Sequence, residues 1–373
     1  MIRDVTYCLD AEGPLTEHPH DTVMRLIREH GLSEQVTGHP QTILRDVQEG
    51  KYGPRLADVA APHRLAFLSS WPAVEDMLDD LTTHRKDYCD SFGTPLRISW
   101  FVIDLIGYRS NPRQRAQGQH AVWDKVSPFF GEDDSVGWHV HTLSPNRDPL
   151  TYGTSWTAML PEHEESLCRR LLDKGHFPAS FRAGGCIERN DMSHWLERFI
   201  PFDYSCLPGA STHGMDWPAT VPYHPDVKDY RRTGAMRRTI FPTFDADSWT
   251  GRVESIPPTL HFSFANHDRK AIRPDLDRIV QLLNRDGVQW RWKTASPAAK
   301  GPDVYITRDF RTVETMDGQI YGEPFVAVEA DGHVYRVNTR QNIPGVWDID
   351  TPARTQRMMA AITTLDGRVG VTL

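Results

Sequence analysis

The feature that most restricts the fold of this chain is the alternation of short apolar segments with amphipathic helical ones. Strand-like runs are predicted at residues 5–9, 97–106, 135–141, 179–182 and 259–264. Helical patterns with apolar residues on one face are predicted at residues 73–83, 162–174, 193–199 and 276–285. Strands separated by helices favour parallel units. The pattern therefore predicts an α/β fold, a β/α barrel over about 290 residues with catalytic groups where strands end.

The pattern changes near residue 298, after which the chain contains short β-type runs. Asp-Gly pairs at residues 317–318 and 331–332 are typical of hairpin turns, and a helix is expected near residues 352–363. We therefore predict a barrel domain over residues 1–298. A small β-rich C-terminal unit over residues 299–373 is predicted to supply no catalytic group.

The stretch at residues 14–72 directly follows the first predicted strand and is rich in turn residues. It has two interpretations, a lid insertion over the mouth of the barrel or a surface excursion without function.

Composition excludes several classes of function. The formal net charge is −8 and the basic residues are scattered, which argues against nucleic acid as a partner. The first residues contain no apolar signal region, and no segment is apolar enough to span a bilayer, so we expect a cytoplasmic protein without membrane attachment. The five cysteines are widely spaced and form no CxxC pair, which predicts neither a zinc ribbon nor a disulfide framework.

Polar residues follow three of the predicted strands. Asp10 and Glu12 follow the first, and two carboxylates there could act as a base and a metal ligand. His139 and His141 are two residues apart on a strand, so both imidazoles face the same side and could bind one ion. Arg182 ends another strand, before two glycines, and could orient a carboxylate. Alone, each pattern also fits a solvated or packed side chain.

In this order, the three patterns resemble the motifs of the polysaccharide deacetylases (carbohydrate esterase family four, chitooligosaccharide-deacetylase-like). The resemblance covers residues 3–295 and implies a distorted β/α barrel of that type, with the β-rich unit as an appendage. It implies that Asp10 is the catalytic base, that Glu12, His139 and His141 bind the metal, and that Arg182 orients Asp10. The segment at residues 202–208 also fits the family.

Three features depart from the family pattern. The family spaces its metal histidines four residues apart, so His141 must replace the second one. Ala183 stands where the family has proline, and the segment after Glu12 is unusually long. The family's last motif supplies a histidine as general acid, for which His261 and His267 are both candidates.

The resemblance implies a metal-dependent hydrolase that removes an N-acetyl or N-formyl group from an amino-sugar derivative in carbohydrate metabolism. The cofactor expected is a divalent metal, with Zn²⁺ ahead of Co²⁺, Mn²⁺, Ni²⁺ or Fe²⁺. The expected partner is a small-molecule N-acylated sugar in a cytoplasmic glycan or natural-product pathway. Two alternatives stay open: a cyclic amide or imide hydrolase, and a non-catalytic carbohydrate-binding protein with a degenerate site.

Overall fold

The structure is a computed structural model. It describes residues 2–14, 46, 49–51, 70–103, 120–140, 160–184, 194–205, 239–241, 243–245, 261–267, 272–285, 287–316 and 319–372. The residues predicted to form a lid, 14–72, lie almost entirely outside this part. No helix in the described part is both long and apolar enough to cross a membrane.

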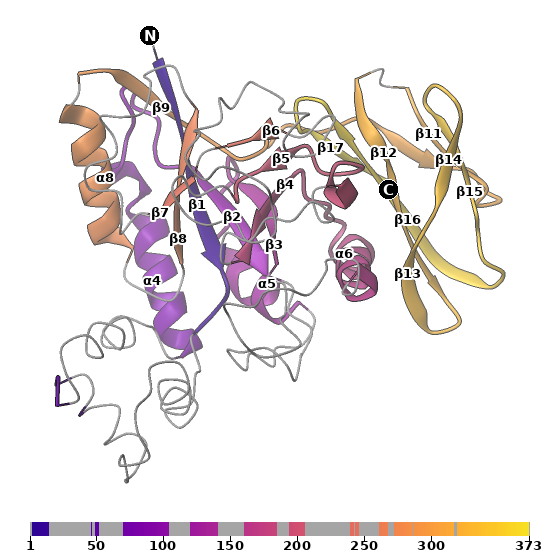
Figure 1. Cartoon of the computed structure of the whole chain (residues 1–373), viewed down its shortest axis with the longest axis horizontal. Coiled ribbons are helices and arrows are strands. Elements are labelled where there is room, and N and C mark those ends of the chain that lie inside the picture. Colours follow the sequence, from indigo (N-terminus) through magenta and orange to yellow (C-terminus); the bar gives the residue numbers. More distant parts are fainter. Residues whose placement is uncertain are drawn as a thin grey trace.

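A nine-stranded sheet, sheet A, forms the N-terminal part of the chain, and all its strand pairs are parallel (Figure 1). In spatial order the strands are β6 (Thr239–Ile240), β5 (Phe202–Asp203), β4 (Ser180–Ala183), β3 (Ser135–Val140), β2 (Ile98–Ile103), β1 (Ile2–Ala11), β8 (Phe262–His267) and β7 (Thr243–Asp245), with β9 (Gln289–Lys293) also paired to β1. This arrangement agrees with a partial β/α barrel. Within the described ranges no pairing joins β6 to β7.

Helices follow the strands, and those at residues 73–83, 162–174 and 276–285 lie close to where the sequence predicted them. The helices are α4 (Trp71–Thr83), α5 (Ala121–Val126), α6 (Leu160–Lys174) and α8 (Arg273–Arg285), with 3₁₀ turns η2 (Arg85–Asp87) and η3 (Ser127–Phe129). The helix between β2 and β3 was not predicted, and in the described part of the helix expected at 193–199 only residues 194–196 are helical. In α8 the buried residues Leu276, Ile279 and Leu283 are spaced at helical intervals, so one face packs on the sheet. Gly287 follows the end of α8 at a positive φ of 69°, which glycine adopts without strain.

The central strand β1 divides its side chains between two environments. Tyr7, Leu9 and their alternate neighbours pack into the core between sheet and helices. Cys8 packs on the other face with Phe101 and Tyr204, in a separate core inside the curve of the sheet. Because strand side chains alternate with period 2, Asp10 lies on the same face as Cys8.

The C-terminal residues form two antiparallel four-stranded sheets. Sheet B has the order β10 (Val304–Ile306), β11 (Thr312–Thr315), β15 (Val346–Ile349) and β14 (Thr339–Ile343). Sheet C has the order β13 (His333–Val337), β12 (Ile320–Ala330), β16 (Thr355–Thr364) and β17 (Val369–Val371). A core shared by the two sheets includes Val326 and Trp347.

The helix predicted near residues 352–363 is wrong, because this segment is strand β16. Ala361 faces a core that contains α6, whereas Ala360 and Ile362 face the core between sheets B and C. Both faces of the strand are therefore apolar, and the alternation that marks a half-buried strand is missing from the sequence.

Sheet C packs directly on α6, which lies between it and sheet A (Figure 1). Phe325 of β12 is fully buried, with its ring centroid 4.8 Å from that of Phe177 and 5.3 Å from that of Phe199. Glu164 of α6 accepts hydrogen bonds from Arg336 Nε at 2.7 Å and Trp195 Nε1 at 3.0 Å. Sheet C and sheet A thus share one core through α6, whereas the core between sheets B and C is separate.

Candidate active site

The register of sheet A brings together the polar residues that follow its strands. Arg182 on β4 pairs with His139 on β3, and His139 pairs with Ile103 on β2. Glu12 is level with Ile103, because Ala11 of β1 pairs with the residue preceding Ile103. These side chains therefore meet at the carboxyl edge of the sheet, where ligands bind in parallel α/β folds.

Asp10 lies two residues before Glu12 and is held by Arg182. Arg182 Nε donates to both carboxylate oxygens of Asp10, at 2.8 and 2.9 Å, and Arg182 Nη1 donates to the Tyr204 carbonyl at 2.7 Å. Asp10 is 1% exposed and Arg182 is 5% exposed. A planar guanidinium anchored at two points fixes the orientation of the carboxylate that it contacts.

The segment after β5 supports Arg182, a role that the sequence did not reveal. Besides the Tyr204 carbonyl, the Ser205 hydroxyl accepts a hydrogen bond from the Ala183 N–H at 2.7 Å. The Ser205 N–H in turn donates to the buried Asp203 carboxylate at 2.8 Å. The only sequence signal was the likeness of residues 202–208 to a family segment, which indicated the neighbourhood and not the contacts.

His139 contacts backbone with one ring nitrogen and an acid with the other. Its Nδ1–H donates to the Arg182 carbonyl at 2.9 Å, so in the neutral ring Nε2 carries a lone pair. Nε2 lies 3.0 Å from Glu12 Oε1. The Nε2 lone pair and the Glu12 carboxylate oxygen are both acceptors, so a contact this short requires a proton or a cation between the two atoms. Metal-binding histidines commonly donate their other ring N–H to a carbonyl in this way.

The ligand atoms of Asp10, Glu12 and His139 all lie within 4.8 Å of one another, and all three residues are buried. Among the described residues this is the one such cluster of potential metal ligands. One imidazole nitrogen with two carboxylates suits a divalent ion such as Zn²⁺. Glu12 and His139 are two of the three ligands that the sequence predicted, and the third member of this cluster, Asp10, is the predicted base.

Two of the predicted site residues cannot be placed as side chains. His141, the second metal histidine, lies outside the described residues. His267 is the last residue of β8, and its backbone pairs with Asp10 in the parallel register. Its side chain also lies outside the description.

The general-acid alternative His261 is corrected by the structure. It directly precedes β8, whose first residue pairs with Val5 of β1, five residues before Asp10. The backbone of His261 is therefore level with Asp4, six residues before Asp10. At about 3.3 Å per residue, this is a separation of about 20 Å along the strand. His261 Nε2 lies 2.5 Å from Thr6 Oγ1, its ring lies 4.6 Å from Phe241, and burial lowers its pKa to about 4. His261 is a packing residue far from the acid cluster.

The inner face beneath the acid cluster is closed by packed side chains. Cys8, Phe101, Tyr204 and Phe241 form a buried core there, and the rings of Tyr204 and Phe241 stack with centroids 4.5 Å apart. Burial raises the pKa of the Cys8 thiol and of the Tyr204 hydroxyl well above their ordinary values. Burial therefore favours the neutral form of both groups.

Neither a protein-family model nor a curated protein sequence matches this chain. Solved structures with a weak overall likeness include an alpha-L-fucosidase from Bacteroides thetaiotaomicron, with 10% identity, a TM-score of 0.31, and coverage of 99% of this chain and 92% of that one. A bacterial fucosidase with an inhibitor has 9% identity, a TM-score of 0.30, and coverage of 97% and 92%. A modular endo-beta-1,4-mannanase from Cellulomonas fimi has 12% identity, a TM-score of 0.23, and coverage of 82% and 70%. At these TM-scores the likeness carries no argument about activity.

Proposed function

We propose that this chain is a metal-dependent hydrolase of the polysaccharide deacetylase type that removes an N-acetyl or N-formyl group from an amino-sugar derivative. The observation that carries the proposal is the buried cluster of Asp10, Glu12 and His139, with Arg182 bound to Asp10. Asp10 and Glu12 meet there with His139 and Arg182, which follow them by more than a hundred positions, in a combination that suits metal-assisted hydrolysis of an amide.

Glu12 and His139 would hold the metal, together with His141. A divalent ion bound there would polarise the amide carbonyl and lower the pKa of water. Burial favours this role, because a cation in a site of low dielectric constant interacts strongly with its ligands. The hydrogen bond from His139 Nδ1 to the Arg182 carbonyl keeps Nε2 turned toward Glu12.

Asp10 would act as the general base, since Arg182 fixes its carboxylate beside the proposed ligands. It would accept a proton from water as the water oxygen bonds to the amide carbon. The carbon–nitrogen bond then breaks, and the amine leaves with a proton from a general acid. We assign the acid role to His267, whose backbone is level with Asp10. The products are a free amine and acetate or formate.

The proposed substrate is a small N-acylated sugar and not a polymer. The inner core of Cys8, Phe101, Tyr204 and Phe241 closes the space below the acids, so a ligand must approach from the carboxyl edge of the sheet. The cyclic imide alternative uses the same water attack on an amide carbonyl and enters the test below as a second substrate class.

The test compares amine release from N-acetylated and N-formylated sugars, free and nucleotide-linked, with release from chitin oligomers and with opening of succinimide. The Asp10→Asn variant should keep the fold and the bound metal while turnover falls by about 10²–10⁴. Asp4→Asn, at the other end of β1, is the matched control and should keep full turnover.

Near-normal turnover by Asp10→Asn would remove Asp10 as the base. A metal-loaded protein that turns over none of these compounds but binds sugars would favour the non-catalytic alternative. Efficient turnover of long oligomers without turnover of small compounds would reject the substrate assignment.

A further inference from the structure

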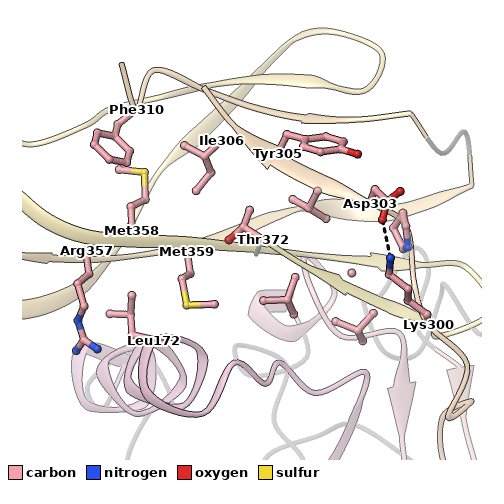
Figure 2. Close-up of a pocket in the computed structure, with 15 residues that line it drawn as sticks. Leu172, Lys300, Asp303, Tyr305, Ile306, Phe310, Arg357, Met358, Met359 and Thr372 are labelled. Atoms are coloured by element: carbon pink, nitrogen blue, oxygen red, sulfur yellow. Dashed lines mark hydrogen bonds and ion pairs between the residues drawn. The ribbon is translucent and has the colours of Figure 1, made fainter. Parts of the chain in front are cut away.

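A cavity of about 600 Å³ lies in the C-terminal unit, and none of its lining residues belongs to the candidate active site. Figure 2 shows it between β10, β16, β17 and the end of α6. We call it the C-terminal groove. Its volume falls within the range of about 300–1,000 Å³ that is typical of small-molecule pockets.

The wall of the C-terminal groove is mainly aliphatic. Leu172, Ile306, Met358, Met359, Val369 and Val371 contribute to it. The Thr372 hydroxyl also lines the groove, where it accepts a hydrogen bond from the Ala360 N–H at 3.0 Å and keeps its own O–H to donate. A sugar or nucleotide would leave polar groups unpaired against the aliphatic part of this wall, which is unfavourable. An aliphatic chain needs no such partners, and flexible methionines can adapt to it.

Phe310 stands at one end of the groove in an unusual backbone conformation. Its φ is 56°, in the left-handed region that bulky residues rarely adopt, and the residue is 40% exposed. Its N–H donates to the Thr307 carbonyl at 2.8 Å, and its carbonyl accepts a hydrogen bond from the Thr351 hydroxyl. Strained conformations that are fixed by their surroundings occur preferentially at binding sites. Here the backbone conformation places the aromatic ring of Phe310 at the end of the apolar wall.

The charged residues occupy opposite ends of the groove (Figure 2). Arg357 is bound by two acids, with Nε 2.5 Å from Glu329 and Nη2 2.9 Å from Asp173. Lys300 contacts Asp303 at 2.9 Å, and the side chains of this pair are 78% and 59% exposed. An exposed pair of this kind contributes little to stability. Lys300 can therefore exchange Asp303 for a ligand anion, whereas Arg357 is already neutralised.

We propose that the C-terminal groove binds a medium-chain aliphatic carboxylate, with its chain along the apolar wall toward Phe310 and its carboxylate at Lys300. This assignment is independent of the proposed hydrolase function, because the groove shares no residue with the acid cluster.

The test is titration calorimetry of the full chain with decanoate and with decanol, which has the same chain length and no charge. We expect one saturable site per chain. Lys300→Glu should weaken decanoate binding about two- to fivefold and leave decanol binding unchanged, because only the head group loses its partner. Lys86→Glu, an exposed lysine outside the groove, should affect neither ligand. Met358→Glu should weaken both ligands.

Folding of each variant is checked by its urea midpoint, and Lys300→Glu keeps the test decisive even if Met358→Glu fails to fold. Absence of saturable binding of both ligands would overturn the proposal. Equal effects of Lys300→Glu and Lys86→Glu on decanoate would also overturn it. Saturable binding of an N-acetylglucosamine oligomer that Met358→Glu abolishes would show that the groove is a sugar site instead.

Discussion

The pair formed by Arg182 and Asp10 is almost completely buried, so its contribution to stability should differ from that of an ordinary ion pair. Replacing Arg182 by methionine keeps much of the side-chain volume but removes the guanidinium. Asp10, which is 1% exposed, then loses the cation that contacts both of its oxygens. The Tyr204 carbonyl also loses its donor.

Removing one partner of a buried ion pair costs about 3–5 kcal/mol, because the remaining charge stays buried. We expect Arg182→Met to lose this amount of unfolding free energy. In the double variant Asp10→Asn/Arg182→Met, no uncompensated carboxylate remains at residue 10. Its loss should therefore be smaller than the sum of the two single losses, by about 1–3 kcal/mol.

The assay is urea denaturation followed by tryptophan fluorescence, with a metal chelator present so that loss of a bound ion does not contribute. The matched control is Arg291→Met, which removes the exposed contact between Arg291 and Asp4 on the same central strand. The side chains of that pair are 45% and 26% exposed, so its loss should cost under about 1 kcal/mol. Equal losses for Arg182→Met and Arg291→Met, or strict additivity in the double variant, would refute the reasoning.

Three further changes test the packing of the molecule, each through the unfolding free energy measured in urea. Phe325→Ala should cost about 3–5 kcal/mol, because a fully buried ring between α6 and sheet C is lost; a loss under about 1 kcal/mol would contradict the shared core. Gly137→Ala should cost about 1–3 kcal/mol, since its new Cβ would lie 2.6 Å from the Phe101 ring and 2.7 Å from Ser180 Oγ; an unchanged stability would show that the inner face has spare room. Burial lowers the pKa of His163 to about 3, below its unfolded value of about 6.5. The stability that the folded protein gains from the neutral ring is therefore complete above pH 6.5 and is lost as the pH falls toward 3. His163→Gln should make this acid dependence shallower by about 1.4 kcal/mol per pH unit, and an unaltered slope would exclude His163 as its source.

The parallel sheet and the meeting of polar residues at its carboxyl edge could be predicted because they depend on local patterns. The apolar runs that became β1, β2, β3 and β4 each pack on both faces, and each ends near a polar residue. Neighbouring parallel strands then bring their carboxyl ends to one edge without further information. Asp10, Glu12, His139 and Arg182 therefore meet as the sequence predicted.

Other parts of the structure depend on contacts that no local pattern records. Strand β16 is apolar on both faces because it lies between two cores, so its sequence resembles a helix as much as a strand. The anchor of Arg182 is the Tyr204 carbonyl, a backbone group that every residue has. His261 follows an apolar residue as the family histidine does, but only the strand register shows that it lies at the opposite end from Asp10.

The two-residue steps along β1 have a consequence for how this chain can change over evolution. The inward side chains of Thr6 and Cys8, in the lower half of β1, belong to the packed inner core, where substitutions are expected to affect folding. Asp10 and Glu12, in the upper half of β1, lie on the same face of the strand and carry the polar cluster beyond that core. New chemistry could therefore arise by exchanging the upper residues alone, while the lower ones preserve the shape of the sheet. A single strand would thus combine a conservative half with an adaptable half, and relatives with different reactions should differ mainly in the upper one.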